Sequence, residues 1–238
     1  MQEATTRLKR SEAQTVYSPN PETNLRSVMV LGATGLVGGE CLRLLAEDDS
    51  VGRIVVLTRR RVGSLDAVPK VEQHVVDFDR LTAHARLFAV DQIFCALGTT
   101  QRKTPGKHRY RVIDFLYPIT AAHLGIEKGA SHYLVVSAVG ASSRSLFFYN
   151  RLKGELEDAL KALPYRSVTI IQPSVLKGER AEPRTSEKLA WKLAFLTPAK
   201  YKPVEGASVA RALVLAARAN QRGIRVIPNR EIEAATPQ

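Results

Sequence analysis

Three residues of this chain have types and a spacing that could perform proton-transfer chemistry: Ser137, Tyr149 and Lys153. Tyr149 and Lys153 are four positions apart, so a helix would carry both on one face. A tyrosine hydroxyl ordinarily titrates near about 10 and is a poor base at neutral pH, but a nearby ammonium group favours the phenolate. The pair therefore predicts a tyrosine that gives or takes a proton. Ser137, twelve residues before Tyr149, could hydrogen-bond the oxygen of a substrate.

A Tyr-x-x-x-Lys pair is common by chance, and a surface pair is the alternative, so its context matters. The glycine-rich run 32–38 follows the apolar run Val28–Leu31 and opens an apolar stretch of helical period. Strand, glycine turn and helix in this order form the context of a dinucleotide site, in which the helix N-terminus offers unpaired N–H groups to a pyrophosphate. A plain turn is the alternative here. The residues that the run assigns to a cofactor are Gly32, Thr34, Gly35, Leu36, Val37 and Gly38.

Short apolar segments rich in Val and Ile alternate with helical periodicities along the chain. This alternation predicts an α/β fold, a doubly wound and mostly parallel sheet with helices on both faces. The expected strands are Val28–Leu31, Arg53–Thr58, Glu72–Val76, Gln92–Ala96, His132–Ser137, Ser167–Gln172 and Ile224–Ile227. The expected helices are Val37–Glu47, Leu81–Phe88, Arg109–Lys128 with a kink at Pro118, Ser145–Leu163, Ser186–Phe195 and Ala207–Arg218.

The segment after the second strand bears on the choice of nicotinamide cofactor, because ligands of such sheets lie at the carboxyl ends of the strands. An NAD-binding chain usually carries Asp or Glu about 20 residues past the glycine run, to hold the ribose 2′-hydroxyl. This chain has Thr58 there, followed by Arg59 and Arg60. A guanidinium can grip a 2′-phosphate through two parallel hydrogen bonds, so NADP(H) is favoured over NAD(H). A solvated basic loop is the alternative.

The segments after the third and fourth strands add candidates for cofactor binding. Asp77 could accept a hydrogen bond from an adenine amino group, with Phe78 beside the ring, although an aspartate that caps a turn is nearly as good an interpretation. The run Leu97-Gly98-Thr99 is small enough to let the chain pass close to a ribose and a nicotinamide, and a simple turn is again the alternative.

These motifs together resemble the short-chain dehydrogenase/reductase superfamily, and within it the atypical branch that includes the Tat-interacting-protein oxidoreductases and their bacterial relatives. The resemblance covers about Val28 to Ile232. The glycine run and Tyr-x-x-x-Lys define only the superfamily, whereas the threonine pair that ends the run 96–100 and the Lys-Gly-Glu of 153–155 are more specific to the branch. Two further segments resemble the branch, Leu57–Arg60 and Pro173–Leu176, the latter continued by 178–180.

The resemblance implies a Rossmann-type fold with NADP(H) along the strand ends. It implies Tyr149 as general acid/base, Lys153 as its activator and a holder of the nicotinamide ribose, and Ser137 as the orienting partner. It adds Pro173, Val175 and Leu176 to the cofactor site. Two departures stand out: Asp114 lies where conventional members carry an asparagine for a proton relay, and Ala138 follows Ser137 where relatives often have a second serine.

Bulk properties bound the kind of protein and its partners. The net charge of +12 suggests an anionic partner, but no nucleic-acid-binding signature accompanies it, so a small-molecule substrate, anionic or neutral, is expected rather than nucleic acid. No apolar run is long enough for a membrane span, the two cysteines suit buried positions in a reducing cytoplasm, and the histidines suggest no metal site. We expect a flexible tail over 1–26 and one domain over 27–238, with a substrate-side insertion over 173–205, as a monomer or homodimer.

Three hypotheses about function follow. The first is an NADP(H)-dependent oxidoreductase that acts on a carbonyl or alcohol. The second is an epimerase or dehydratase of the same superfamily, which the modest stretch 173–219 disfavours because such enzymes usually carry a larger sugar-nucleotide domain. The third is an NADP(H)-responsive regulator with little turnover, which the basic run Arg102–Arg111 motivates.

Overall fold

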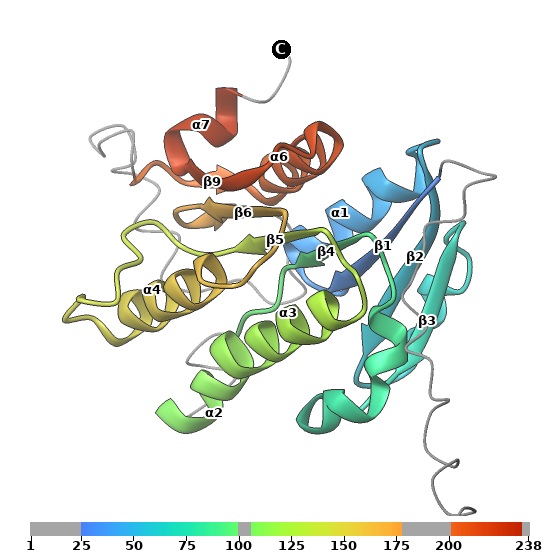
Figure 1. Cartoon of the computed structure of the whole chain (residues 1–238). Coiled ribbons are helices and arrows are strands. Elements are labelled where there is room, and N and C mark those ends of the chain that lie inside the picture. Colours follow the sequence, from blue (N-terminus) through green and yellow to red (C-terminus); the bar gives the residue numbers. More distant parts are fainter. Residues whose placement is uncertain (1–24, 100–105, 178–200, 235–238) are drawn as a thin grey trace, which may run out of the picture.

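The main sheet of this protein is parallel, and β1 and β4 lie side by side in its middle (Figure 1). The computed structural model describes residues 25–99, 106–177 and 201–234. Within these residues the sheet has seven strands in the order β3-β2-β1-β4-β5-β6-β9. The chain runs outward from β1 to β3, returns to β4 beside β1 and continues to β9, so the strand order reverses between β1 and β4. The fold is therefore a Rossmann-like α/β fold, as predicted.

The predicted strands of the main sheet are all present, each with ends within two residues of the expected ones. Their residues alternate between two cores: Val28 and Val30 contact one, and Met29 and Leu31 contact the other. Both faces of the sheet are covered, which explains the continuous apolar runs in the sequence. The strands are β1 (Arg26–Leu31), β2 (Val51–Thr58), β3 (Val71–Val75), β4 (Gln92–Cys95), β5 (His132–Val136), β6 (Ser167–Gln172) and β9 (Gly223–Pro228); β7 (Leu176–Lys177) and β8 (Val204–Glu205) form a separate small pair.

Helices cover the two faces of the sheet as separate layers (Figure 1). The helices α1 and α6 pack on one face, and η2, α3 and α4 pack on the other. The helices are α1 (Leu36–Ala46), η1 (Gly63–Leu65), η2 (Phe78–Phe88), α2 (Lys107–Arg111), η3 (Val112–Leu116), α3 (Tyr117–Glu127), α4 (Phe148–Lys161), α6 (Gly206–Ala219) and α7 (Asn229–Ala234).

The helix predicted over Arg109–Lys128 is present as three consecutive helical segments, α2, η3 and α3. Pro118 stands in the first turn of α3, where a missing N–H is tolerated. The turn before it, η3, is a π-helical turn in which the Tyr117 N–H donates to the Val112 carbonyl. The wide turn absorbs the break that proline imposes. It also contains Asp114, which is buried.

Two other predicted helices begin at different residues from those expected. The segment Ser145–Phe147 precedes α4 as a turn, in which the Phe147 N–H donates to Ser145 Oγ. The predicted helix Leu81–Phe88 begins earlier, at Phe78, because the Asp77 carboxylate accepts the Asp79 N–H and caps it. The predicted helix Ser186–Phe195, nearly all of the tail 1–26 and most of the insertion 173–205 lie outside the described residues.

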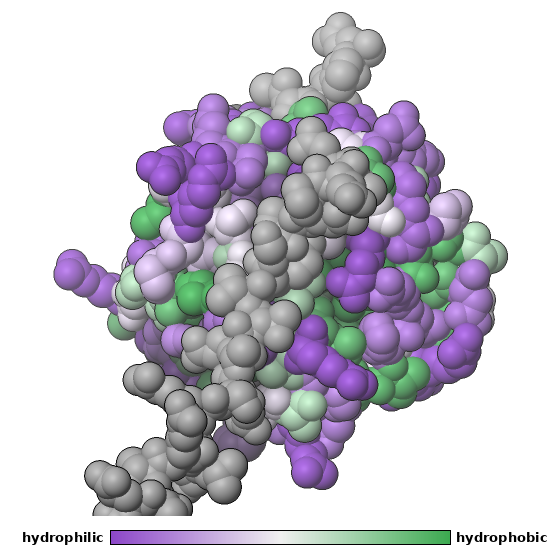
Figure 2. Space-filling model, turned by 45° about the vertical axis from the view of Figure 1, so that its right-hand side comes forward, coloured by the Kyte–Doolittle hydropathy of each residue, from purple (hydrophilic) through white to green (hydrophobic). Residues whose placement is uncertain are grey.

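The surface of the protein is mainly hydrophilic on the face that Figure 2 shows, where hydrophobic residues lie in separate groups between polar ones. Within the described residues, no helix combines the length and the apolar character that crossing a membrane requires.

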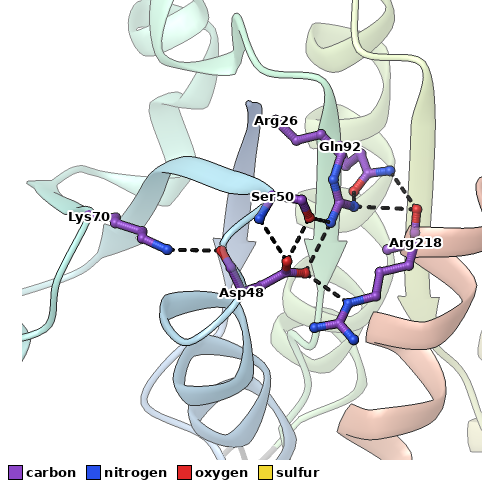
Figure 3. A network of polar contacts seen from close by, with 7 residues as sticks. Arg26, Asp48, Ser50, Lys70, Gln92 and Arg218 are labelled. Carbon is purple, nitrogen blue, oxygen red and sulfur yellow. Dashed lines mark hydrogen bonds and ion pairs between the residues drawn. The ribbon is translucent and has the colours of Figure 1, made fainter. Parts of the chain in front are cut away.

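A buried carboxylate, Asp48, ties the amino edge of the sheet together (Figure 3). It accepts hydrogen bonds from Arg26 at 3.1 Å, from Ser50 at 2.6 Å and from Arg218 at 2.9 Å. These partners come from β1, from the turn before β2 and from the last turn of α6. Burial alone would raise the pKa of the Asp48 carboxyl, but its bonds with Ser50 and Arg218 outweigh that effect and lower the pKa to about 2.

Replacement of Asp48 by Asn should therefore remove an acid-dependent part of the stability. Because the pKa of the folded carboxyl is depressed, its contribution is present above about pH 4 and is lost as the pH falls towards about 2. The shift corresponds to about 2 kcal/mol of unfolding free energy at pH 7. Urea unfolding of the wild type and D48N at pH 7, 5 and 3 should show a difference that shrinks as the pH falls. The exposed neighbour Asp49, changed to Asn, is the control, and a difference for D48N that is constant over this pH range would contradict the assignment.

Candidate functional site

A tight glycine turn joins β1 to α1 at the point where the strand order reverses. Gly32 adopts φ +85°, and a Cβ there would lie 2.6 Å from the Ala96 carbonyl oxygen. The Gly35 N–H closes the turn on the Gly32 carbonyl at 2.9 Å. A Cβ on Gly38 would lie 2.1 Å from the same carbonyl oxygen. The glycines at 32 and 38 are therefore required by the close passage of three backbone segments.

The N-terminus of α1 faces this turn without a side chain that neutralises it. Gly35 is the N-cap residue, no side chain caps the helix and its first turn contains no acidic residue. Thr34 and Gly35 are exposed, Leu36 is half-buried and Val37 is buried in the core. The first turn of α1 therefore presents backbone N–H groups and the positive end of the helix dipole to a ligand.

A pocket of about 370 Å³ lies beyond the carboxyl ends of β2 and β3. Arg59, Asp77 and Phe78, three of the residues predicted for cofactor binding, line it together. Arg60 is exposed and is not among the lining residues. The full lining is Arg59, Val75, Val76, Asp77, Phe78, Asp79, Arg109 and Tyr117.

Two lining residues, Arg109 and Tyr117, were not predicted as site residues. Arg109 forms an ion pair with Asp79 at 2.9 Å and lies over the Tyr117 ring, 5.6 Å from its centroid. The Tyr117 hydroxyl donates to the same carboxylate, and this bond, with that of Arg109, lowers the pKa of Asp79. Burial and the bond to Asp79 raise the pKa of Tyr117 to about 12. Sequence reasoning had grouped Arg109 with a basic run, and only its place on the helix after β4 could have signalled this role.

The predicted pair of Tyr149 and Lys153 lies on one face of α4. The Lys153 ammonium lies 6.0 Å from the centroid of the Tyr149 ring. The ring of Tyr149 meets that of Tyr110 edge to face, with 6.1 Å between centroids. Tyr149 is 38% exposed, whereas Lys153 is buried. A ligand in solution can therefore reach the tyrosine, with the lysine beneath it.

The buried ammonium of Lys153 is paired with Asp114, the residue that departs from the family pattern. The two side chains are 3.0 Å apart, and both are almost completely buried. Burial alone would lower the pKa of Lys153, but the Asp114 carboxylate outweighs this effect and raises it above the usual range. The second oxygen of Asp114 accepts the Thr99 N–H at 2.9 Å. Asp114 thus joins α4 to the Leu97–Thr99 segment, in which Leu97 is half-buried and Gly98 exposed.

Ser137 has a different partner from the substrate oxygen that we predicted. Its buried hydroxyl donates to Glu157, one turn beyond Lys153 on α4. Gln172 at the end of β6 donates to both oxygens of the same carboxylate, at 2.9 and 3.1 Å. Glu157 was missed by sequence reasoning, although the repeat of four positions through 149, 153 and 157 could have signalled it.

The segment after β6 lies next to the end of β5. The Val139 N–H donates to the Pro173 carbonyl at 2.9 Å, which joins the two strand ends. Pro173 is buried, Val175 is exposed, and Leu176 pairs with Val204 in the small sheet. Pro173, one of the residues predicted for the cofactor site, is therefore a neighbour of the strand end that carries Ser137. Among the described residues, no group of three or more His, Cys, Asp or Glu side chains could hold a metal ion.

Comparisons with known proteins agree on the kind of fold. A family model described as semialdehyde dehydrogenase, NAD binding domain, matches residues 27–107. Protein HTATIP2 of Rattus norvegicus is 33% identical over 70% of this chain and 69% of its own length. Protein fmp52, mitochondrial, of Aspergillus niger is 30% identical over 89% of this chain and 92% of its own. The solved structure of MoeE5 in complex with UDP-glucose and NAD is 16% identical with a TM-score of 0.64, over 87% of this chain and 80% of that one.

The fold and the glycine turn define an NAD(P)-binding Rossmann protein of the short-chain dehydrogenase/reductase class. Within that class the chain belongs to the atypical family that contains HTATIP2 and FMP52. The family points to an oxidoreductase-like or epimerase-like protein that binds a nicotinamide cofactor. The substrate and the choice between NAD(H) and NADP(H) are matters for proposal.

Gly154, the glycine of the Lys-Gly-Glu sequence, allows the loop before α4 to dock on that helix. A Cβ at this position would lie 2.1 Å from the Ser142 backbone. Replacement of Gly154 by Ala should therefore displace the loop and destabilise the fold by about 2 kcal/mol or more, as overpacking does. The control is G63A, because a Cβ on Gly63 meets nothing within 4 Å. Thermal unfolding should separate the two variants, and equal midpoints would contradict the loop packing.

Proposed function

We propose that the protein is an NADP(H)-dependent oxidoreductase that acts on a small carbonyl or alcohol substrate, with Tyr149 as general acid/base. The observation that carries the proposal is an accessible tyrosine whose ring centre lies 6.0 Å from the ammonium of a buried lysine on the same face of α4. The chain after β4, which Asp114 joins to that lysine, passes within backbone contact of the glycine turn at Ala96. A phosphate-binding turn and a proton-transferring pair thus share one edge of the sheet.

The residues at the strand ends fit a dinucleotide cofactor. The uncapped first turn of α1 would hold the pyrophosphate, because its N–H groups and dipole favour an anion. The pocket beyond β2 and β3 would take the adenosine, with the Phe78 ring as an apolar wall. Lys153 would hold the nicotinamide ribose, near Leu97, Gly98, Thr99 and the segment of Pro173, Val175 and Leu176. The cofactor, when bound, supplies or accepts a hydride.

Preference for NADP(H) rests on the charges around the adenosine pocket. Arg59 lines the pocket, and Thr58 stands in place of the acidic residue that an NAD site usually carries. The Thr58 side chain is buried and bonds to Gln73, so it does not serve as an acceptor for a ribose. The Asp79 carboxylate is engaged by Arg109 and Tyr117, which leaves Arg59 as a guanidinium for a 2′-phosphate.

Tyr149 would transfer the proton to or from the substrate. In reduction its hydroxyl gives a proton to the substrate oxygen, and in oxidation its phenolate removes one. The Lys153 ammonium lies 6.0 Å from the centre of the Tyr149 ring, on the same face of α4. Ser137 would accept a hydrogen bond from the hydroxyl of an alcohol substrate and would donate none to a carbonyl oxygen, because its own proton is given to Glu157. A small-molecule substrate and a cytoplasmic location complete the proposal; the FMP52 relatives are named as mitochondrial proteins.

Replacement of Arg59 by Ala should weaken NADPH binding and leave NADH binding nearly unchanged. Loss of hydrogen bonds from a guanidinium to a phosphate costs about 1.5–3 kcal/mol, which is about a 10- to 100-fold loss of affinity. Calorimetric titration of the wild type and R59A with each cofactor measures this. R222A, at the opposite edge of the sheet beside β9, is the control. Equal weakening for both cofactors would contradict the 2′-phosphate role, and no binding of either by the wild type would contradict the proposal itself.

Replacement of Tyr149 by Phe should abolish turnover and spare cofactor binding, because only the proton-transferring hydroxyl is removed. General acid/base catalysis contributes about 10²- to 10⁴-fold, so the rate of NADPH oxidation against a panel of aldehydes and ketones should fall by that factor. Y165F, which removes a hydroxyl bonded to the Ala122 carbonyl, is the control and should keep its turnover. Unchanged turnover in Y149F would sink the assignment of Tyr149. Cofactor binding by a wild type that turns over no carbonyl would favour an NADP(H)-responsive regulator.

A further inference from the structure

The backbone of Thr99 is held at both of its polar groups by one helical face. Its N–H donates to Asp114 at 2.9 Å, and its carbonyl accepts the Tyr110 hydroxyl at 3.1 Å. Tyr110 and Asp114 are four positions apart in α2 and η3, and both are buried. They are therefore neighbours on the inward face of this helical run.

The same two side chains contact the two functional residues of α4. The Tyr110 ring meets the Tyr149 ring edge to face, and Asp114 forms its ion pair with Lys153. Tyr110 and Asp114 lie one turn apart, and they contact two residues of α4 that also lie one turn apart. An outer ion pair between Arg111 and Glu155 joins the two helical segments on the exposed side.

We infer that Tyr110 and Asp114 are positioning residues that fix the Thr99 segment, Tyr149 and Lys153 as one unit. The inference rests on the proposed function and deepens it, because the unit joins the chain that would line the nicotinamide to the pair that would move the proton. Asp114 contacts Lys153 directly, so the lysine is held in place by a carboxylate where the family's asparagine would serve a proton relay.

The Asp114 carboxylate restrains the position of the Lys153 side chain. A lysine side chain has four rotatable bonds, and a buried ammonium without a partner would move towards water or lose its proton. The Asp114 carboxylate fixes the ammonium at 3.0 Å and shares its other oxygen with a backbone N–H. A displacement of Thr99 would therefore move the carboxylate, and the lysine with it. The inward placement of Asp114 depends in turn on the π turn before Pro118.

Two conservative variants separate the parts of this unit. Y110F removes the hydroxyl bond to Thr99 and keeps the ring beside Tyr149. D114N keeps an acceptor for the Thr99 N–H and removes the charge that pairs with Lys153. D91N is the control, because Asp91 also accepts a backbone N–H, that of Ser27, at the amino ends of the strands, away from the candidate site.

The first readout needs neither cofactor nor substrate. Amide hydrogen exchange should show the Thr99 N–H exchanging about five- to tenfold faster in Y110F, because loss of the hydroxyl bond to the Thr99 carbonyl loosens the segment that holds this N–H against Asp114. Exchange should be at least as fast in D114N, because a neutral amide oxygen is a weaker acceptor for the same N–H than a carboxylate. Nitrogen NMR of labelled lysines should show the Lys153 ammonium protected from solvent exchange in the wild type and Y110F, and unprotected in D114N. D91N should move neither signal.

The second readout is kinetic. With NADPH and a reactive aldehyde, kcat should fall at least tenfold in D114N and several-fold in Y110F, while the KM for NADPH changes less than threefold. A purely structural role would lower the melting temperature and leave kcat unchanged in the folded fraction. If D114N does not fold, Y110F carries the test through Thr99 exchange and kcat.

The outcomes distinguish this inference from the proposed function. Unchanged Thr99 exchange in Y110F, or a protected Lys153 ammonium in D114N, would overturn the inference, even if the wild type reduces carbonyls at full rate. If the wild type reduces no carbonyl, the proposed function fails, and the exchange and NMR signals still decide whether Tyr110 and Asp114 fix the unit.

Discussion

The structure depends on one steric constraint, the close passage of three backbone segments where the strand order reverses. Side chains at positions 32 and 38 would collide with the carbonyls of Ala96 and Gly32. Because these positions are glycines, β1 and β4 lie side by side and α1 packs against the turn that follows β1. The reversal sends the chain to opposite edges of the sheet, and the strand ends at this point form the edge on which a ligand can lie. Every candidate site residue follows from that arrangement.

A second constraint is the burial of charge on α4. Lys153 and Glu157 lie one turn apart on the inward face, and each is satisfied by a different element. Asp114 from η3 pairs with the lysine, whereas Ser137 from the end of β5 and Gln172 from β6 bond to the glutamate. Buried ion pairs contribute little net stability compared with apolar packing. Their value here is positional, since each fixes a strand end or a loop relative to the helix that carries Tyr149.

Local patterns in the sequence predicted the elements of this fold but not the contacts between distant ones. The alternation of apolar strands and periodic helices gave each strand of the main sheet to within two residues, and the spacing of Tyr149 and Lys153 predicted their common face. The partners of Ser137, Lys153 and Arg109 were not predicted, because they are 20, 39 and 30 residues away along the chain. Which side chains meet across such distances is decided by the packing of α2, η3 and α4, which no local pattern encodes.

The interrupted helix after β4 connects the two ends of the proposed cofactor site. Arg109 and Tyr117 line the pocket proposed for the adenosine, whereas Tyr110 and Asp114 contact α4. A regular helix has a fixed rise and rotation per residue. The residues that face the pocket and those that face α4 must therefore occupy particular positions along it. The π turn between these residues adds a local change of rotation, which Pro118 stabilises because it cannot continue the regular pattern. Sequence reasoning predicted a kink at Pro118, and the structure places a π turn directly before it, so that one helical run contacts both the pocket beyond β2 and β3 and the inward face of α4.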